Sequence, residues 1–375
     1  MGSKRACIAL FVLTAVAAVF AAQASANRQM LKGIYDPVQP IVAPDTTFPL
    51  LKTLHVQVLR MDLPWSEIAP RRPDHPMDPN DPAYDWDGFD TFVKNAHQHK
   101  IQVVFSIFGT PRWANGGQKP NRAPKKGLDL QKFAYAAAKR YSGTFKPTDA
   151  TTALPSVRRW LAWNEPNSPA FLRPQWLHTK KRNIPVAAQA YVRICTAIWK
   201  GVHATHLKET VACGGTDPNG NNKAGGSRPS IAPLTFLAAL HKYGLRHFDV
   251  YDHHPYYGSP NQAPATVPRG TSSIRLGNIG LLTTLLTRLY GPKNLWITEY
   301  GYQTRPPDRH FGVTYTKQAK YLKQAFAIAR KNPRITLMCW FLLRDETRLA
   351  GWQSGLLTAG GKRKPAFNAF RFLPH

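Results

Sequence analysis

The sequence predicts an α/β protein built as one (β/α)8 TIM barrel. Eight short apolar segments that resemble strands alternate with longer segments of helical periodicity, which is typical of a parallel sheet with crossover helices. The connections after the strands are long, whereas those after the helices are short. The chain of 375 residues is long enough for one such barrel, which typically needs about 250.

The first residues have the features of a secretory signal peptide. Lys4 and Arg5 precede an apolar run over residues 6–22, and Ala24-Ser25-Ala26 offers an A-x-A cleavage site. We expect residues 1–26 to be removed, which would leave a single catalytic domain of 349 residues, 27–375. The apolar run is short for a membrane span, and no later segment is long enough. We therefore expect a soluble, monomeric protein that is secreted or associated with the cell envelope.

The strands are predicted where aliphatic, β-branched and aromatic residues cluster. The fourth of them ends before Pro166, which has no N–H for a sheet ladder. The predicted strands are residues 33–36, 55–62, 101–109, 160–163, 210–214, 248–256, 295–300 and 335–343. The predicted helices are residues 86–100, 129–141, 186–206, 232–243, 279–290, 316–331 and 365–370. A doubly wound open sheet is the alternative fold, but the Gly-rich phosphate turn that it normally carries after an early strand is absent from the sequence.

Two glutamates end two of the predicted strands. Glu165 follows the fourth strand in WLAWNEPN, and Glu299 lies at the end of the seventh in LWITEYG. In a barrel the carboxyl ends of the strands form the face where chemistry occurs. Two carboxyl groups that face each other there suit hydrolysis of a glycosidic bond, because one must be protonated and the other ionised. We expect a raised pKa for Glu165, because Glu299 is a nearby like charge and the cleft is partly dry.

The paired motifs WNEPN and WITEYGYQT resemble those of the clan A glycoside hydrolases, a (β/α)8 superfamily with a glutamate on strands four and seven. The resemblance covers the predicted mature chain in strand order and is closest in style to the cellulase-like family five and the xylosidase-like family thirty-nine. It implies that Glu165, after Asn164, is the acid/base and that Glu299 is the nucleophile of a retaining mechanism. It also implies a carbohydrate substrate.

Further residues are candidates for binding the substrate. The family's pattern places a histidine and a tyrosine on strand six, with the tyrosine bonded to the nucleophile, and His254 and Tyr256 match it. Arg60 alternates with apolar residues on the second strand, and a buried arginine needs an anionic partner. That partner is either Glu299 or Asp62.

Several tryptophans could support a sugar ring. Trp340, late in the eighth strand, resembles the tryptophan on which the family stacks a sugar. Trp65, Trp113 and Trp176 lie in connections that follow strands. We expect one of these three to contact the sugar and the others to anchor their loops.

The charge is strongly positive. The formal net charge is +29, and loss of Lys4 and Arg5 with the leader would leave +27. Such a protein should adhere to anionic polymers, and an anionic cell-envelope polymer is the partner that we expect. No nucleic-acid-binding motif is present, so we expect no nucleic acid partner. Residues 111–128 and 167–185 are basic without acids, which could select an acidic glycan, but we favour a general role because the excess charge extends along the whole chain.

The cysteines and the motifs indicate no metal and no cofactor. Cys195, Cys213 and Cys339 would remain after leader removal, and this odd number leaves at least one free thiol. We interpret all three mainly as small buried hydrophobic residues. No Cys/His spacing is typical of a metal site.

Two other functions are compatible with parts of this pattern. One is a catalytically silent protein on the same barrel that binds carbohydrate or cell wall. The presence of both glutamates together with Asn164 and Tyr256 argues against it. The other is an unrelated hydrolase that uses a metal or a serine, but the sequence has neither a GxSxG elbow nor metal-ligand spacing.

Overall fold

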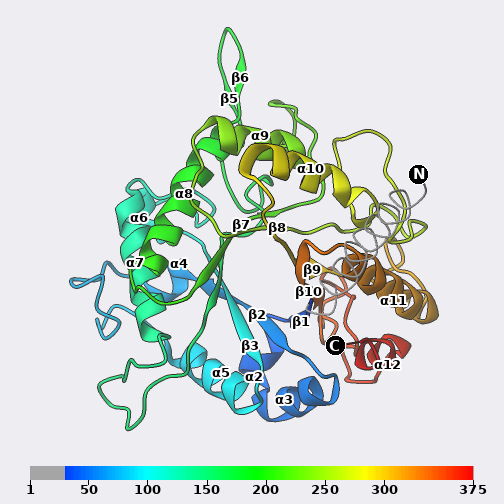
Figure 1. Ribbon diagram of the computed structural model, residues 1–375, viewed down its shortest axis with the longest axis horizontal. Coiled ribbons are helices and arrows are strands. Elements are labelled where there is room, and N and C mark those ends of the chain that lie inside the picture. Colours follow the sequence, from blue (N-terminus) through cyan, green and yellow to red (C-terminus); the bar gives the residue numbers. More distant parts are fainter. Residues whose placement is uncertain (1–29, 375) are drawn as a thin grey trace, which may run out of the picture.

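The computed structural model describes residues 30–374, and it is a closed barrel of eight parallel strands surrounded by helices (Figure 1). The predicted (β/α)8 fold is confirmed, whereas the predicted leader, residues 1–26, lies outside the described residues. Each strand pairs with its neighbours in chain order, and β10 closes the barrel onto β1. The barrel strands are β1 (Leu31–Tyr35), β2 (Val58–Pro64), β3 (Gln102–Phe108), β4 (Arg159–Ala162), β7 (Thr210–Thr216), β8 (Val250–His253), β9 (Leu295–Tyr300) and β10 (Ile335–Phe341).

The helices cover the outside of the barrel. All seven predicted helices are present within a few residues of their expected ends. They are α5 (Asp87–Gln98), α7 (Gly127–Arg140), α8 (Val186–His203), α9 (Pro233–Lys242), α10 (Ile279–Tyr290), α11 (Tyr315–Lys331) and α12 (Pro365–Arg371). Short elements complete the connections: α2 (Gln39–Val42), α4 (Trp65–Ile68), α6 (Arg112–Asn115), η2 (Leu276–Asn278) and a hairpin of β5 (Leu177–His178) and β6 (Asn183–Ile184). In residues 30–374 no helix combines the length and apolar character needed to cross a membrane.

The helix between β1 and β2 is absent from the sequence prediction. This helix, α3 (Pro44–Thr53), reads PDTTFPLLKT and contains Pro49 in its interior. Internal proline and neighbouring threonines both disfavour a helix locally. Phe48 and Leu51 are buried against the barrel, so tertiary packing stabilises a helix that local propensity would not form.

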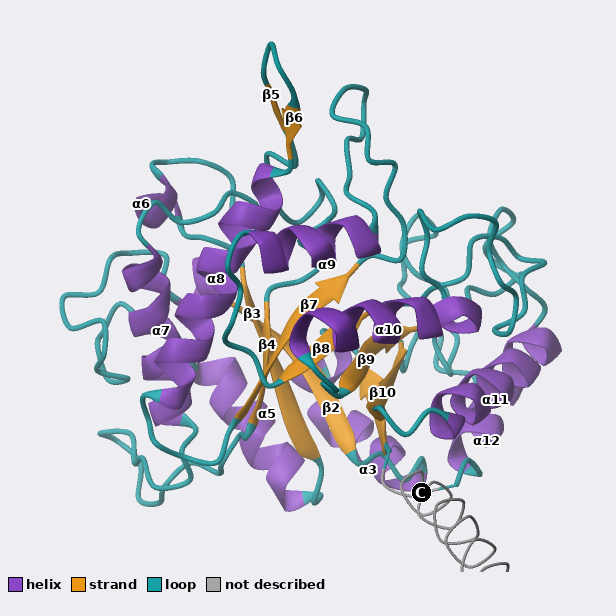
Figure 2. Ribbon diagram, turned by 45° about the horizontal axis from the view of Figure 1, so that its top comes forward, coloured by secondary structure: helices purple, strands orange, loops and turns teal. Residues whose placement is uncertain are grey.

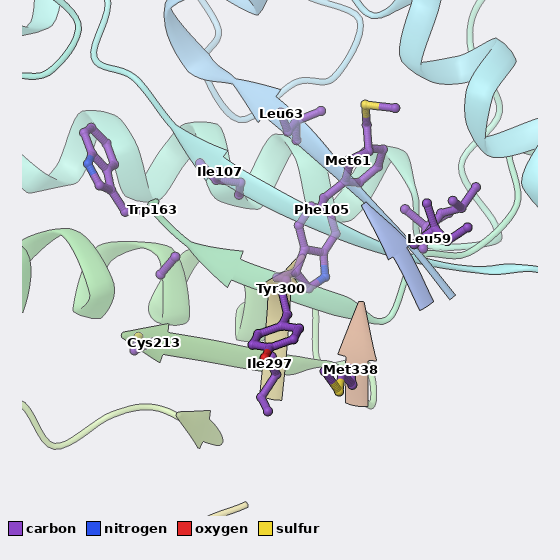
Figure 3. Packing of buried hydrophobic residues seen from close by; sticks show 14 of the residues in the cluster. Leu59, Met61, Leu63, Phe105, Ile107, Trp163, Cys213, Ile297, Tyr300 and Met338 are labelled. Carbon is purple, nitrogen blue, oxygen red and sulfur yellow. The ribbon is translucent and has the colours of Figure 1, made fainter. Parts of the chain in front are cut away.

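Alternation along the strands divides the core into two parts. Leu59, Met61 and Leu63 of β2 belong to the outer cluster between barrel and helices, together with Phe105 and Ile107 of β3 (Figure 3). The residues between them point into the barrel. That interior cluster consists of Tyr35, Val58, Val104, Leu161, Ala212, Val250, Tyr256, Trp296, Leu337, Cys339, Phe341 and Leu342. The same alternation places Arg60 and Asp62 on the inner face of β2, which carries them to the barrel mouth.

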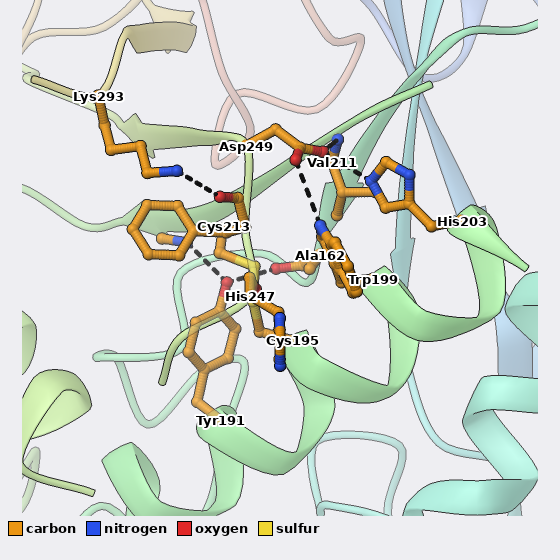
Figure 4. Close-up of a disulfide and its surroundings, with 12 residues drawn as sticks. Ala162, Tyr191, Cys195, Trp199, His203, Val211, Cys213, His247, Asp249 and Lys293 are labelled. Carbon is orange, nitrogen blue, oxygen red and sulfur yellow. Dashed lines mark hydrogen bonds and ion pairs between the residues drawn. A yellow bond between two sulfur atoms is a disulfide. The ribbon is translucent and has the colours of Figure 1, made fainter. Parts of the chain in front are cut away.

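A disulfide joins the barrel to its helical layer. Cys195 on α8 and Cys213 on β7 are bonded, with their Cα atoms 6.1 Å apart (Figure 4). The interpretation of all three cysteines as buried hydrophobic residues is therefore wrong for this pair, although both are buried. Cys339 is the free cysteine of the described chain, and it is buried inside the barrel. An odd cysteine count indicated a free thiol, but only the packing of α8 on β7 shows which two are paired.

Candidate active site

The loop after β4 holds Glu165 at the barrel mouth. Trp163 and Glu165 have positive φ angles of 71° and 35°, which non-glycine residues adopt rarely and mostly where surrounding contacts enforce them. The Glu165 N–H donates to the carbonyl of Gly215 over 2.8 Å, which fixes the turn against the end of β7. The side chain of Glu165 retains 13% exposure, so it is enclosed but reachable from the mouth.

Glu299 lies at the end of β9 and is held at both oxygens. The Tyr256 hydroxyl donates to Oε1 over 2.8 Å, and Arg60 donates to Oε2 over 3.0 Å. Its side chain is 10% exposed. Both oxygens of Glu299 therefore accept hydrogen bonds, one of them from a guanidinium, and these donors orient the carboxyl group.

The two glutamates approach each other closely. One carboxylate oxygen of each and a ring nitrogen of His254 all lie within 4.8 Å of one another. His254 Nδ1 lies 3.1 Å from Glu165 Oε1 and 3.6 Å from Glu299 Oε2. Glu165, His254 and Glu299, which the sequence predicts at the ends of three different strands, therefore lie together.

Arg60 organises the base of the site. It is fully buried, and besides Glu299 it donates to Asn164 Oδ1 over 2.6 Å. Its contact with Asp62 is longer, at 3.7 Å, and its guanidinium stacks on the Tyr35 ring at 4.0 Å. Of the two partners left open by the sequence, Glu299 makes the direct hydrogen bond and Asp62 the looser ion pair.

His254 is embedded among carboxylates. Burial acts to lower its pKa, but the charges of Glu299, Asp252 and Glu165 outweigh burial and raise the pKa to about 10. Its Nε2 lies 3.3 Å from Asp252 Oδ2, and Asp252 in turn accepts from the Thr298 hydroxyl over 2.7 Å. His254 thus lies between Asp252 and Glu165, and the contact at its Nδ1 orients the Glu165 carboxyl group.

Glu165 titrates far above an ordinary glutamate. Burial, and then the negative charge of Asp217, raise the pKa of Glu165 to about 7 against the opposing hydrogen bond from His254. The charge of Glu299 acts in the same direction but is a smaller contribution than that of Asp217. The expected direction is therefore found, with a larger contribution from a residue that the sequence prediction did not include. A group with this pKa can donate a proton near neutral pH and later accept one.

Asp217 is placed by Asn167, another residue absent from the sequence prediction. The buried Asn167 side chain accepts from the Asp217 N–H over 2.9 Å and donates to the Asp217 carbonyl over 3.1 Å. It also donates to the Ile231 carbonyl over 3.0 Å. Asn167 therefore joins the loop after β4 to the loop after β7. WNEPN contains this asparagine, but nothing in the sequence indicates its partners.

Glu165, His254 and Glu299 are also spaced so that they could share one cation. Arg60 already supplies a positive charge 3.0 Å from Glu299 and 3.2 Å from the His254 ring. A divalent ion in this position would have to compete with the guanidinium. The arrangement thus matches an acid and an ion-paired carboxylate better than a metal centre.

Trp340 does not reach the site. It is fully buried in the outer cluster, edge-on to Tyr300 at 6.2 Å, and its indole N–H donates to the carbonyl of Ser354. The expectation that a sugar stacks on Trp340 is wrong, because alternation along β10 turns Cys339 and Phe341 inward and Trp340 outward.

A different tryptophan lies beside the glutamates. Trp352, in the loop after β10, is half-buried. Its ring centroid is 5.2 Å from that of Tyr256 and 5.4 Å from that of Phe341. The sequence prediction did not include this residue, because nothing in the loop sequence shows that it folds back to the mouth. Trp352 therefore offers a partly exposed aromatic surface next to the Tyr256 hydroxyl that is bonded to Glu299.

The three other tryptophans anchor their loops but differ in how much of the side chain is exposed. Trp65 is fully buried and packs edge-on against Trp113 at 5.5 Å. Trp113 donates to the Ala69 carbonyl and Trp176 to the Ser230 carbonyl. Trp113 and Trp176 are half-buried, so these two retain the surface that a sugar contact would need, whereas Trp65 does not.

Comparison with solved structures identifies the class of fold. A family 39 glycoside hydrolase from Bacteroides cellulosilyticus WH2 superposes with a TM-score of 0.64 at 18% identity, over 92% of this chain and 63% of its own. A glucosidase from Croceicoccus marinus gives 0.65 at 13% identity, over 92% and 65%. A family 1 β-glucosidase from Thermotoga maritima gives 0.57 at 12% identity, over 91% and 96%.

These neighbours support the resemblance to clan A glycoside hydrolases at the level of the fold. The chain spans about two thirds of the length of the first two. Its sequence matches no protein-family model and no curated protein. The comparison therefore shows the fold, and the activity has to be argued from the residues at the mouth of the barrel.

Proposed function

We propose that this chain is an exported retaining glycoside hydrolase, with Glu165 as acid/base and Glu299 as nucleophile. The observation that carries the proposal is the contrast between two neighbouring carboxyl groups. Glu165 has a pKa of about 7, whereas Glu299 accepts hydrogen bonds from Arg60 and Tyr256. One group is prepared to give a proton and the other to remain an anion, which is the division of roles that glycosidic cleavage needs.

The spacing of the carboxyl groups favours retention over inversion. Retaining enzymes hold their two carboxyl groups about 5–5.5 Å apart, whereas inverting enzymes leave about 6.5–9.5 Å for a water molecule. One oxygen of Glu165 and one of Glu299 lie within 4.8 Å of each other, and this close approach supports the retaining arrangement. Direct attack by Glu299 on the anomeric carbon is the chemistry that fits this distance.

The reaction then has two steps. In the first, a Glu299 oxygen forms a bond to the anomeric carbon while the bond to the leaving oxygen breaks, and Glu165 gives its proton to that oxygen. In the second, Glu165 takes a proton from water, the water oxygen bonds to the anomeric carbon, and Glu299 leaves. His254 keeps Glu165 in place through its Nδ1 contact of 3.1 Å. Arg60 and Tyr256 stabilise the Glu299 anion between turnovers.

Two side chains are suited to hold the sugar beside these groups. Arg60 donates to the amide oxygen of Asn164. The amide nitrogen of Asn164 has no hydrogen-bond partner within residues 30–374. That nitrogen can donate to a sugar hydroxyl near the reacting carbon. Trp352 presents a half-buried ring at the same place, against which the C–H face of a sugar can pack.

Two further observations support export and adhesion. The predicted leader of residues 1–26 is one, and the bond between Cys195 and Cys213 is the other, because disulfides persist mainly in oxidising compartments. The net charge of +29 favours adhesion of the protein to an anionic cell-envelope polymer. Such adhesion rests on many weak contacts, which salt screens. We expect the protein to act as a monomer.

The experiment that tests the proposal is a screen of aryl glycosides and polysaccharides in which the first-formed anomer is identified by proton NMR. A Glu299→Gln variant serves as the control for contaminating activity. We expect at least one substrate to be cleaved with retention and the variant to be inactive. A first-formed product of inverted configuration would disprove the nucleophile assignment. Carbohydrate binding without turnover of any substrate would instead support a silent carbohydrate-binding barrel.

A further inference from the structure

We propose that the loops after β3 and β4 form one binding surface for an acidic polysaccharide that leads to the barrel mouth. We refer to residues 111–128 and 167–185 together as the basic flank. The basic flank contains nine lysines and arginines and no aspartate or glutamate. They are Arg112, Lys119, Arg122, Lys125, Lys126, Arg173, Lys180, Lys181 and Arg182. None is buried, and within residues 30–374 none of them forms an ion pair.

The two loops of the basic flank are joined side by side. Arg122 and Arg173 form an isolated β-bridge between them. The Arg173 N–H donates to the Asn121 carbonyl over 2.8 Å, and the Asn121 side chain donates to the Ala170 carbonyl over 3.2 Å. Two arginines from different loops are therefore held as neighbours. Their backbones are adjacent, neither side chain has an acidic partner within the described chain, and the Arg173 Nε donates to the Pro169 carbonyl over 2.7 Å. Two neighbouring arginines without an acidic partner are suited to an anionic ligand.

The loop after β4 also extends a basic arm into solvent. β5 and β6 form a hairpin that projects away from the barrel (Figure 2). Thr179 closes its turn by accepting from the Arg182 N–H over 3.0 Å and donating to the Arg182 carbonyl over 2.6 Å. Lys180, Lys181 and Arg182 at the tip are exposed, and Leu177 is 49% exposed. The hairpin buries little apolar surface, so core packing gives no reason for it, whereas contact with a polyanion does.

The neighbouring loop shows that this charge is not uniform around the mouth. The connection after β2, residues 65–86, carries two arginines against five acids. The acids are Glu67, Asp74, Asp78, Asp81 and Asp85. The rim is therefore acidic after β2 and strongly basic after β3 and β4, which a general excess of positive charge does not produce. Together with the bridge between the two basic loops and the exposed hairpin, this contrast favours a local role over the general role expected from the sequence.

The position of the basic flank beside the candidate glycosidase site favours a glycan over other anionic polymers as its ligand. Glu165 lies two residues before residues 167–185 in the same connection, so the basic flank begins beside the acid/base. The claim that this polymer is also the substrate rests on the proposed glycoside hydrolase function, whereas the binding claim does not. The shared chemistry of the ligand is a chain of repeating carboxylate or sulfate groups.

The test compares two variants of the full chain that remove the same charge. The hairpin variant replaces Lys180, Lys181 and Arg182 by glutamine. The control variant replaces three exposed lysines of α11 by glutamine, namely Lys320, Lys323 and Lys331. Binding is measured to alginate, dextran sulfate, neutral dextran and duplex DNA over a range of salt concentrations. Alginate and dextran sulfate distinguish a carboxylated from a sulfated ligand.

We expect the hairpin variant to lose at least about tenfold in affinity for one acidic polysaccharide at about 50 mM salt, where screening is weak, and the control variant to lose less than about threefold. The slope of log Kd against log salt should fall by roughly two to three in the hairpin variant only. Turnover of a small neutral glycoside should be unchanged in both.

Equal losses in the two variants, or no binding of either acidic polysaccharide, would overturn the proposal. Tighter, hairpin-dependent binding of DNA than of both polysaccharides would also overturn it and assign the surface to nucleic acid. Because binding is measured without catalysis, failure of the proposed enzymatic function would leave these results interpretable. Binding without hydrolysis of the bound polymer would contradict only the identification of that polymer as the substrate.

Discussion

Replacing the proposed acid/base by its neutral isostere should stabilise the protein increasingly as the pH rises above about 4.5, and should have no effect at lower pH. The pKa of Glu165 is raised from 4.5 to about 7 in the folded state. Below the lower value, glutamate is protonated in both the folded and the unfolded chain, so Glu165→Gln changes the charge of neither. Above the higher value, the folded chain must hold an ionised Glu165 in a buried site beside Asp217, whereas glutamine carries no charge there. The stability of the wild type relative to Glu165→Gln should therefore fall between pH 4.5 and pH 7.

The size of the effect follows from the shift. Each pKa unit corresponds to about 1.36 kcal/mol, so the shift of Glu165 from 4.5 to about 7 predicts that Glu165→Gln gains roughly 3 kcal/mol at pH 8 and close to nothing at pH 4. Thermal midpoints and urea denaturation of both proteins across this pH range measure the difference. Hydrolysis of glycosides with poor leaving groups should be lost in the same variant, since glutamine cannot donate the proton.

The matched control is Glu67→Gln, the same chemical change at an exposed glutamate of α4. The difference in thermal midpoint between this variant and the wild type should be the same at pH 4 and pH 8. A stability gain for Glu165→Gln that is equal at pH 4 and pH 8 would mean that packing rather than charge explains it. The absence of any gain at pH 8 would show that Glu165 is an ordinary glutamate and would remove the main support for its role as the acid.

Three further changes have defined outcomes. Tyr256→Phe removes the hydroxyl that is bonded to Glu299, so kcat/KM should fall about tenfold to a hundredfold while the thermal midpoint moves little. An unchanged kcat/KM would show that the contact has no catalytic role. Asp217→Asn removes a charge that raises the pKa of Glu165, so the alkaline limb of the pH–rate profile should move to lower pH, and a shift to higher pH would contradict this. Replacing both Cys195 and Cys213 by serine should lower the free energy of unfolding by about 2–4 kcal/mol, measured by urea denaturation, whereas no change would indicate that α8 packs on β7 without help from the bond.

Most of the barrel could be predicted because each strand and helix has a local signal. The exception among the longer helices is α3, where proline and threonine conceal a segment that only packing makes helical. The sequence does not predict the β5–β6 hairpin, because two-residue strands are too short for a periodic pattern. The two misses have different causes, because α3 depends on packing against distant parts of the chain, whereas the hairpin pairs locally, Leu177 with Ile184 and His178 with Asn183.

Some residues of the candidate site could likewise be predicted from the sequence, and others could not. Glu165 and Glu299 could be located because each follows an apolar run at a strand end. Trp340 was misplaced because β10 is apolar on both faces, so alternation could not show which face is inward. Asp217 and Trp352 lie in loops, and no sequence pattern shows how a loop folds back onto the mouth.

The most direct test of the central claim is covalent labelling of the nucleophile. The protein is incubated with a panel of 2-deoxy-2-fluoroglycosyl fluorides, which form the glycosyl-enzyme but hydrolyse it slowly, and peptides are then mapped by mass spectrometry. We expect one reagent to add the mass of a single fluorosugar to the peptide that contains Glu299, and no label to appear in Glu299→Gln. A label on another residue, or turnover of a glycoside substrate without any trapped sugar, would contradict the assignment of Glu299 as the nucleophile.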